Sequence, residues 1–240
     1  MKKLFTIVLL LAMLLSLCAC GKSENEIRGQ ISAPAESASG ESAPAEEAEE
    51  PGLAEAAENV EAEAGVINGG RYESSFLGIG CELDENWTYA SREQMIELLG
   101  TTSDMFNDTE YEDAIKDAEM FYDMYAAVAD GTASINVLVQ NLGLIYGTVL
   151  SVEQYVDLST QSLSEQLEAA GFSDVKWEKV ELDFAGETRP GLKISSQVQG
   201  IPYYCTQSYI KAGNHIAVVS FAAYFEDSTE AMLDYFFPGE

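Results

Sequence analysis

Few residues of this chain combine the type and the spacing that catalysis needs. His215 is the only histidine among 240 residues, so a Ser-His-Asp or Cys-His mechanism would have to use it. It follows the turn at Gly213-Asn214 and begins a predicted strand, where we expect a surface histidine rather than a general base. No motif supports a relay between His215 and Cys205. We therefore predict no catalytic residue.

Carboxylates are abundant, and one stretch holds a cluster of them: Asp104, Asp108, Glu110, Glu112, Asp113 and Asp117. Such oxygen ligands suit calcium, but the stretch lacks the alternating ligands, central glycine and closing glutamate of an EF-hand. A solvated acidic helix face is the favoured interpretation, and weak cation association is the alternative. A pair of glycosidase carboxylates stays open, although no pair stands out. With one histidine and no cysteine cluster, we expect no transition-metal site and no cofactor.

Cys81 and Cys205 both lie in predicted strands. A buried cysteine commonly behaves as a small hydrophobic residue, so two separate thiols are the favoured interpretation. The alternative is a disulfide between them, which an extracytoplasmic location would permit.

Residues 1–19 have the organisation of a cleaved signal peptide. Lys2 and Lys3 precede a largely apolar run from Leu4 to Leu17, which is too short to span a bilayer of about 30 Å. The segment ends in Leu17-Cys18-Ala19-Cys20-Gly21 and resembles the lipobox of bacterial lipoproteins.

The lipobox resemblance implies that the Cys20 thiol receives diacylglycerol and that the signal is cleaved before Cys20. Cys18 does not fit the acceptor position, because Leu17 before it is too large for the small-residue position. We therefore expect a lipid anchor that holds the protein on the extracytoplasmic face of the cell membrane. The alternative is an ordinary secretory signal that ends at Ala19.

Charge and composition set residues 20–66 apart as a tether. Without residues 1–19, the 41 acidic residues face 10 basic ones, which gives a net charge of −31. This charge repels nucleic acid and anionic headgroups, so the expected membrane contact is the lipid on Cys20. Residues 20–66 are rich in Ala, Glu, Ser and Pro and hold no aromatic residue. We predict a disordered segment that spans roughly 40 Å.

Residues 67–240 carry both tryptophans and every tyrosine, and we predict one folded domain there. Capping boxes that begin at Ser91 and Ser151 open two helices, which should end at Gly100 and Gly171. A third helix is predicted from Asp227 through Phe236, and a short fourth one near residues 108–117.

Alternating apolar residues predict strands near 72–76, 79–83, 122–128, 135–139, 175–184, 189–198, 201–211 and 214–224. The order of strands and helices predicts an α+β fold, with an antiparallel sheet of about six to eight strands flanked by helices. Most tyrosines in these strands are expected in the core. The alternative is an exposed aromatic sheet face that binds a peptide, glycan or protein.

The segment from Phe76 to Trp87 resembles the start of PsbP-like α/β/α domains, in which an aromatic-x-Gly-aliphatic strand leads through a turn to a tryptophan. The long helix after Ser151 and the four C-terminal strands match the element order of that family across residues 67–240. The resemblance implies an α/β/α sandwich that acts in binding or assembly, with no catalytic residue to transfer. Trp87 would then anchor the core.

We therefore expect a non-catalytic binding or accessory module at the cell envelope, with an envelope protein or ligand as partner and no nucleic acid. The alternatives are a solute-binding component of a transport system and an envelope hydrolase. The first is disfavoured because the pattern predicts one sheet rather than two lobes with a ligand between them. The second is disfavoured because the sequence offers no nucleophile–base pair.

Overall fold

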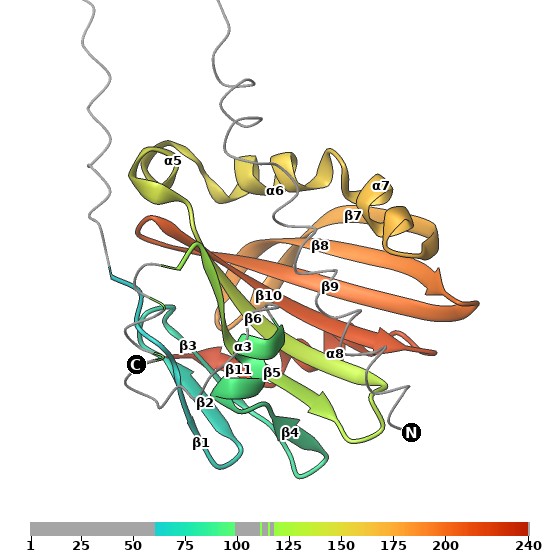
Figure 1. The fold of residues 1–240 in the computed structure, drawn as a ribbon, viewed down its shortest axis with the longest axis horizontal. Coiled ribbons are helices and arrows are strands. Elements are labelled where there is room, and N and C mark those ends of the chain that lie inside the picture. The colour runs from blue at the N-terminus through green and yellow to red at the C-terminus, as the bar shows by residue number, and fades with distance from the viewer. Residues whose placement is uncertain (1–60, 99–110, 112–114, 116–117, 240) are drawn as a thin grey trace, which may run out of the picture.

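The computed structural model describes residues 61–98, 111, 115 and 118–239, and its central layer is a seven-stranded antiparallel sheet (Figure 1). The strand order in this sheet is β4-β5-β6-β10-β9-β8-β7. The strands are β4 (Trp87–Tyr89), β5 (Met120–Val128), β6 (Ala133–Asn141), β7 (Phe172–Phe184), β8 (Glu187–Val198), β9 (Ile201–Ala212) and β10 (His215–Tyr224). This result confirms the predicted antiparallel α+β fold.

A second antiparallel sheet of four strands covers one face of the first, in the order β1-β2-β3-β11. Its strands are β1 (Val66–Asn68), β2 (Arg71–Ser74), β3 (Ile79–Glu82) and β11 (Phe236–Pro238). The short helix α8 (Thr229–Leu233) packs on the same side. Ile79 and Phe236 of this sheet share one apolar core with Val219 and Phe221 of β10. The predicted hairpin at 72–83 is thus real, but it belongs to the second sheet.

Helices cover the opposite face of the seven-stranded sheet. They are α3 (Arg92–Leu98), α6 (Val152–Thr160) and α7 (Leu163–Ala169), whereas α5 (Gly143–Val149) follows the end of β6. Successive side chains of β10 point to opposite faces of the sheet. Ile216 and Val218 point to the helix side, where they share a core with Leu163 and Leu167 of α7. Near β5 and β6, Met95 of α3 packs with the helix-side residues of those strands.

Both predicted capping boxes are present. The Ser151 backbone N–H donates to Gln154 Oε1 over 2.9 Å, and Ser151 Oγ accepts from the Gln154 N–H over 3.2 Å. Ser91 and Gln94 repeat the pair of bonds at the start of α3, with distances of 2.8 and 3.3 Å. Each box provides partners for backbone groups that the first helical turn leaves unsatisfied.

The single helix predicted from Ser151 to Gly171 is wrong, because two helices, α6 and α7, occupy this segment. The Ser159 and Thr160 hydroxyls each donate to the Val156 carbonyl over 2.9 Å, and such back-bonding competes with the helical ladder. Ser162 then leaves the helical conformation, with φ −122° and ψ 12°. Gly171 does end the second helix, with a φ of +94°.

The helix predicted to run through Phe236 is also wrong, since α8 ends at Leu233. Phe236 instead pairs with Cys81 in the second sheet and packs against Phe184 and Phe221, with ring centroids 5.0 and 5.5 Å away. Burial of Phe236 against these two rings therefore outweighs continuation of a short helix. Within the described ranges, no helix is long and apolar enough to cross a bilayer.

Candidate functional site

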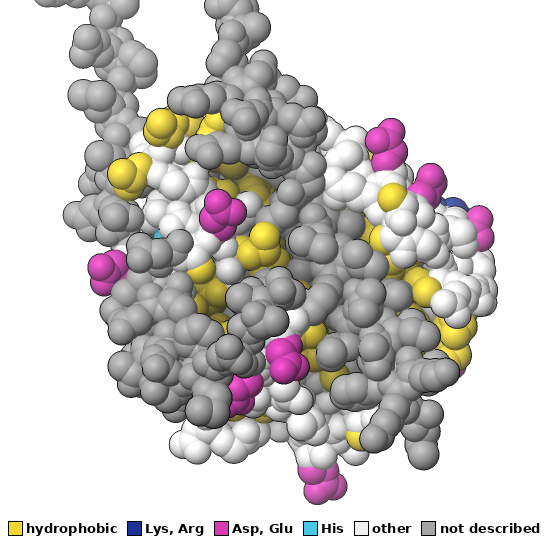
Figure 2. Space-filling model, viewed as in Figure 1, with side chains coloured by type: hydrophobic (Ala, Val, Ile, Leu, Met, Phe, Trp, Pro, Cys, Tyr) yellow, Lys and Arg dark blue, Asp and Glu magenta, His cyan; other side chains and the backbone are white. Residues whose placement is uncertain are grey.

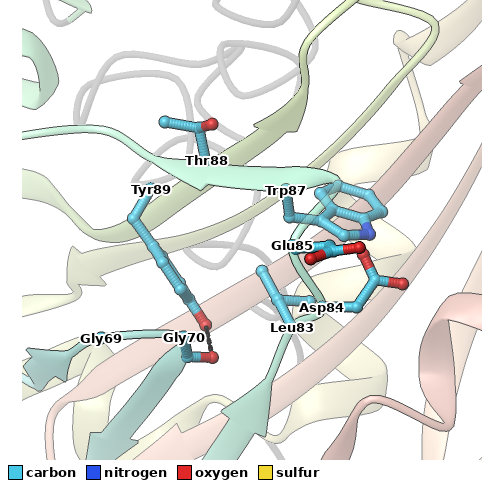
Figure 3. A pocket seen from close by; sticks show the side chains of 8 residues that line it. All are labelled: Gly69, Gly70, Leu83, Asp84, Glu85, Trp87, Thr88 and Tyr89. Atoms are coloured by element: carbon cyan, nitrogen blue, oxygen red, sulfur yellow. Dashed lines mark hydrogen bonds between the residues drawn. The ribbon is translucent and has the colours of Figure 1, made fainter.

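A surface groove lies where the turn between β1 and β2 meets the turn between β3 and β4 (Figure 3). Its volume is about 530 Å³. Two aromatic residues, two carboxylates and exposed glycine backbone share its wall, and the lining residues are Gly69, Gly70, Leu83, Asp84, Glu85, Trp87, Thr88 and Tyr89. A groove of this size can hold a side chain or a small molecule.

Close backbone approach builds the floor of the groove. Gly69 turns the chain with a φ of +63°, and Gly70 then lies so near β3 that an added Cβ would fall 2.8 Å from the Leu83 carbonyl oxygen. The Leu83 N–H donates to the Gly70 carbonyl over 2.8 Å. The Tyr89 hydroxyl donates to that same carbonyl over 3.2 Å, as the dashed line in Figure 3 shows. The floor is therefore rigid without any ligand.

A tight turn presents the two carboxylates. Asp84 Oδ1 accepts from the Asn86 N–H over 2.8 Å, and the Asp84 carbonyl accepts from the Trp87 N–H over 3.1 Å. Asp84 and Glu85 are both exposed, and neither forms an ion pair within the part of the chain that the structure describes. Figure 3 shows both carboxyl groups on the same side of β4 as the Trp87 indole.

The aromatic wall comes from alternate residues of β4. Trp87 and Tyr89 point to the groove side, and Thr88 points to the other side of the strand (Figure 3). Trp87 is half-buried and stacks edge-to-face on Tyr235, with 5.8 Å between the ring centroids. Trp87 thus packs against the core, as its expected anchor role requires, and also lines the groove. Burial raises the pKa of Tyr89 well above its usual range, so its hydroxyl stays protonated and keeps donating.

The groove is built to attract a positive charge. Two carboxylates beside an indole, with no cation paired to them among the described residues, favour an ammonium or guanidinium group. The ionisable side chains that line the groove are Asp84, Glu85 and Tyr89. This arrangement suits recognition of a cation by two carboxylates next to aromatic side chains.

His215 lies elsewhere, and its predicted surface position is wrong. Only 2 % of the residue is exposed, and neither ring nitrogen has a hydrogen-bond partner among the described residues. The ring stacks edge-to-face on Phe76 with 5.4 Å between centroids, and burial lowers the pKa of His215. The register pairs Cys205 with Ala222, which is seven residues or roughly 23 Å along β10 from His215. The imagined relay between these two residues therefore has no geometric basis.

Both strand cysteines are buried thiols that form no disulfide. Cys81 belongs to the core between the two sheets, whereas Cys205 belongs to the core under the helices. The alternative of a bridge is thus not what the structure shows, because the central sheet lies between the two residues. Burial raises the pKa of Cys81 to about 12, so this thiol stays protonated at neutral pH.

One buried polar cluster, around Asp123, could not be predicted from the sequence pattern. Asp123 is fully buried at a bulge in β5, between Tyr122 and Met124. Its carboxylate accepts from the Gly65 N–H and from the Tyr72 hydroxyl, both over 2.6 Å. Burial raises the pKa of Asp123, and these two donors act in the opposite direction. Every polar atom faces protein, so the cluster links elements and offers no access to a ligand.

Several predicted site residues lie outside the described residues, so their predictions stay open. They are the lipidation residue Cys20 and the acidic stretch with its weak cation candidates Asp104, Asp108, Glu110, Glu112, Asp113 and Asp117. Among residues that the structure does describe, no three metal-ligating side chains come together. No known family model matches the chain, and no curated protein matches it.

Proposed function

We propose that the protein is a lipoprotein of the extracytoplasmic membrane face, whose folded domain binds a cationic group on an envelope partner without catalysing a reaction. The groove with Asp84, Glu85 and Trp87 carries this proposal, because it combines negative charge with an aromatic face on a rigid floor. The lipobox at Leu17 to Cys20 supports the location.

The charge of the whole chain supports the same class of partner. A net charge of −31 after removal of residues 1–19 attracts basic proteins over a Debye length of about 8 Å at physiological salt. This field steers a basic partner toward the domain in general, and the groove adds a specific contact. We infer a lysine or arginine side chain as the group that enters the groove.

The PsbP-like relationship is part of this proposal rather than its foundation. The central antiparallel sheet, the long helical segment after Ser151 and the four consecutive strands β7 to β10 support it. One feature departs from an α/β/α sandwich, since the face opposite the helices is covered largely by the four-stranded sheet. An accessory role in an envelope assembly accords with both the resemblance and the groove.

A peptide titration tests the groove directly. All proteins carry Trp177→Phe, so that Trp87 is the only indole and reports from the groove wall. We expect an oligolysine peptide to change Trp87 fluorescence saturably and an oligoglutamate peptide to leave it unchanged. The double variant Asp84→Asn/Glu85→Gln should weaken oligolysine binding by about tenfold, which corresponds to the loss of one or two exposed charge contacts.

The matched control is Glu165→Gln/Glu168→Gln on α7, which removes the same charge from two exposed carboxylates far from the groove in sequence and fold. If this control weakens oligolysine binding as much as the groove variant does, the attraction is general and the groove is not a site. If oligolysine leaves Trp87 fluorescence unchanged, the proposed recognition of a cation is wrong.

A further inference from the structure

Helix α5 exposes an unusual amount of apolar surface. Leu144, Ile145 and Val149 are 57, 71 and 60 % exposed, and they make up half of the six exposed large hydrophobic residues in the described ranges. Figure 2 shows hydrophobic side chains gathered at the upper left, where Figure 1 places α5. Residues 131–152 contain no Asp, Glu, Lys or Arg, although the chain as a whole is strongly acidic. Exposed apolar side chains that gather in this way mark a contact surface.

The inner side of α5 is held in place by close packing and hydrogen bonds. A Cβ added to Gly147 would lie 2.5 Å from Cα of Asn214, so helix and turn are in direct backbone contact. The Leu142 N–H donates to the Asn214 carbonyl over 2.9 Å, and Lys211 Nζ donates to the Leu150 carbonyl over 2.8 Å. The Leu142 N–H and the Leu150 carbonyl thus bond to β9 and to the turn after it, whereas the side chains of Leu144, Ile145 and Val149 are exposed.

The first described residues contact the central sheet near the end from which α5 follows. The Gly65 N–H is bonded to Asp123, and Asp123 follows the first residue of β5 by three positions, or roughly 10 Å. Met120 of β5 pairs with Gln140, at the end of β6 that leads into α5. In Figure 1 the first described residues and α5 lie on the same side of the view. The proposed tether from Cys20 would therefore join the domain at the same end of the sheet as α5.

The size of the patch argues for a bilayer rather than a second protein chain. Three aliphatic side chains present a few hundred Å² at most, well below the roughly 800 Å² that each partner of a stable protein complex buries. A weak apolar contact suffices at a membrane, because a tether of about 40 Å keeps the domain at a high effective concentration beside it. The lack of charge in residues 131–152 also suits the bilayer interface.

We propose that α5 is a membrane-contact helix, which inserts Leu144, Ile145 and Val149 into the outer part of the bilayer and orients the domain. This inference rests on the proposed lipid anchor at Cys20. The orientation follows from the sheet, since α5 follows Asn141 at one end of β6, whereas the groove residue Trp87 pairs with Val128 near the other end of that hairpin. The contact would therefore present the groove away from the membrane, toward a partner.

Depth-dependent quenching in vesicles tests this orientation. The full-length protein, extracted from membranes, is reconstituted into phosphatidylcholine vesicles with brominated acyl chains, which quench only indoles that enter the bilayer. We compare Ile145→Trp with Phe225→Trp, because Phe225 is 58 % exposed and follows the end of β10 that lies opposite α5. All proteins again carry Trp177→Phe, and we expect a loss of fluorescence from Ile145→Trp and none from Phe225→Trp or from the native Trp87.

A second variant separates the apolar contact from mere proximity. Adding Leu144→Ser and Val149→Ser to Ile145→Trp should abolish the quenching, while the lipid on Cys20 keeps the protein on the vesicles. Both substitutions lie at exposed positions, so the fold should be preserved. Quenching that persists in this variant, or equal quenching of Phe225→Trp, overturns the inference.

The state of Cys20 distinguishes the two proposals. If the protein carries acyl mass and stays with the vesicles but Ile145→Trp is not quenched, only the contact by α5 is wrong. If Cys20 carries no acyl mass, the proposed anchor fails and the membrane contact falls with it.

Discussion

The imidazole of His215 begins β10 in an apolar setting, stacked on Phe76 and without a hydrogen-bond partner among the described residues. A buried neutral imidazole is destabilised by protonation, because the charged form would lose its hydration. His215 is also the only histidine in the chain, so its contribution to pH dependence near neutrality can be isolated.

Replacing this residue should remove a defined part of the pH dependence of stability. The pKa of His215 is lowered in the folded state, and an unfolded histidine titrates near 6.5. The unfolded chain therefore binds more protons below pH 6.5, and the parent protein loses stability as the pH falls through that value, by up to about 1.4 kcal/mol per pH unit. Urea unfolding at pH 7.5 and pH 5 should show a larger loss in the parent than in His215→Phe, because the carboxylates contribute to the pH dependence of both proteins. Equal losses in both proteins would contradict the assignment.

At the scale of elements, one buried carboxylate joins the entry of the chain to both sheets. Asp123 in β5 of the central sheet bonds Gly65 before β1 and Tyr72 in β2 of the second sheet. Arg92 of α3 adds a bond from its guanidinium to the Asp123 carbonyl over 3.1 Å and also donates to the Gly65 carbonyl. The segment before β1 is thus part of the folded unit, and Ala62 is already buried, ahead of the boundary at residue 67 that composition suggests.

Removal of this carboxylate should loosen the entry segment. Asp123→Ala leaves a buried N–H and a buried hydroxyl without their acceptor, at a cost of about 1–3 kcal/mol for each group. We expect the free energy of unfolding to fall by about 2–6 kcal/mol and the Gly65 amide to exchange faster with deuterium. Glu165→Ala, at an exposed position on α7, is the control and should change stability by less than about 0.5 kcal/mol. A loss as small as that of the control would show that Asp123 does not join these elements.

Periodicity in the sequence identifies the long elements and misses the short ones. β7 to β10 are each ten or more residues long and rich in apolar residues, and the capping boxes mark where α3 and α6 begin. β1, β4 and β11 have three residues each, which is too few for alternation to be visible. α5 contains Gly143 and Gly147, and its apolar face points outward, so it lacks the pattern of a helix packed on a core.

The groove could not be predicted for a related reason. It is assembled from two turns and one three-residue strand, and its floor depends on how closely Gly70 approaches Leu83. The only visible signals were the Gly69-Gly70 pair and the acidic turn before Trp87, each of which also fits an ordinary loop. The exposure of His215 was predicted wrongly because Phe76, in the turn between β2 and β3, packs against its ring. Both outcomes depend on contacts between segments distant in the chain.

At the scale of the whole molecule, the described entry of the chain, the apolar helix α5 and the groove lie along the β5–β6 hairpin. The chain enters and α5 emerges near one end of the hairpin, and the groove lies toward the other. Nine residues of β6 separate these ends by roughly 30 Å. If the proposed lipid on Cys20 and the proposed contact by α5 hold this end at a membrane, the acidic, aromatic groove would face partners that approach from outside it.

The intact mass of the protein extracted from native membranes tests the central claim most directly. We predict a chain that begins at Cys20 and carries acyl mass, and that Cys20→Ser, unlike Cys18→Ser, releases the protein from the membrane fraction. An unmodified chain, or a mature chain that begins at another residue, would contradict the account of a lipid-anchored binding domain.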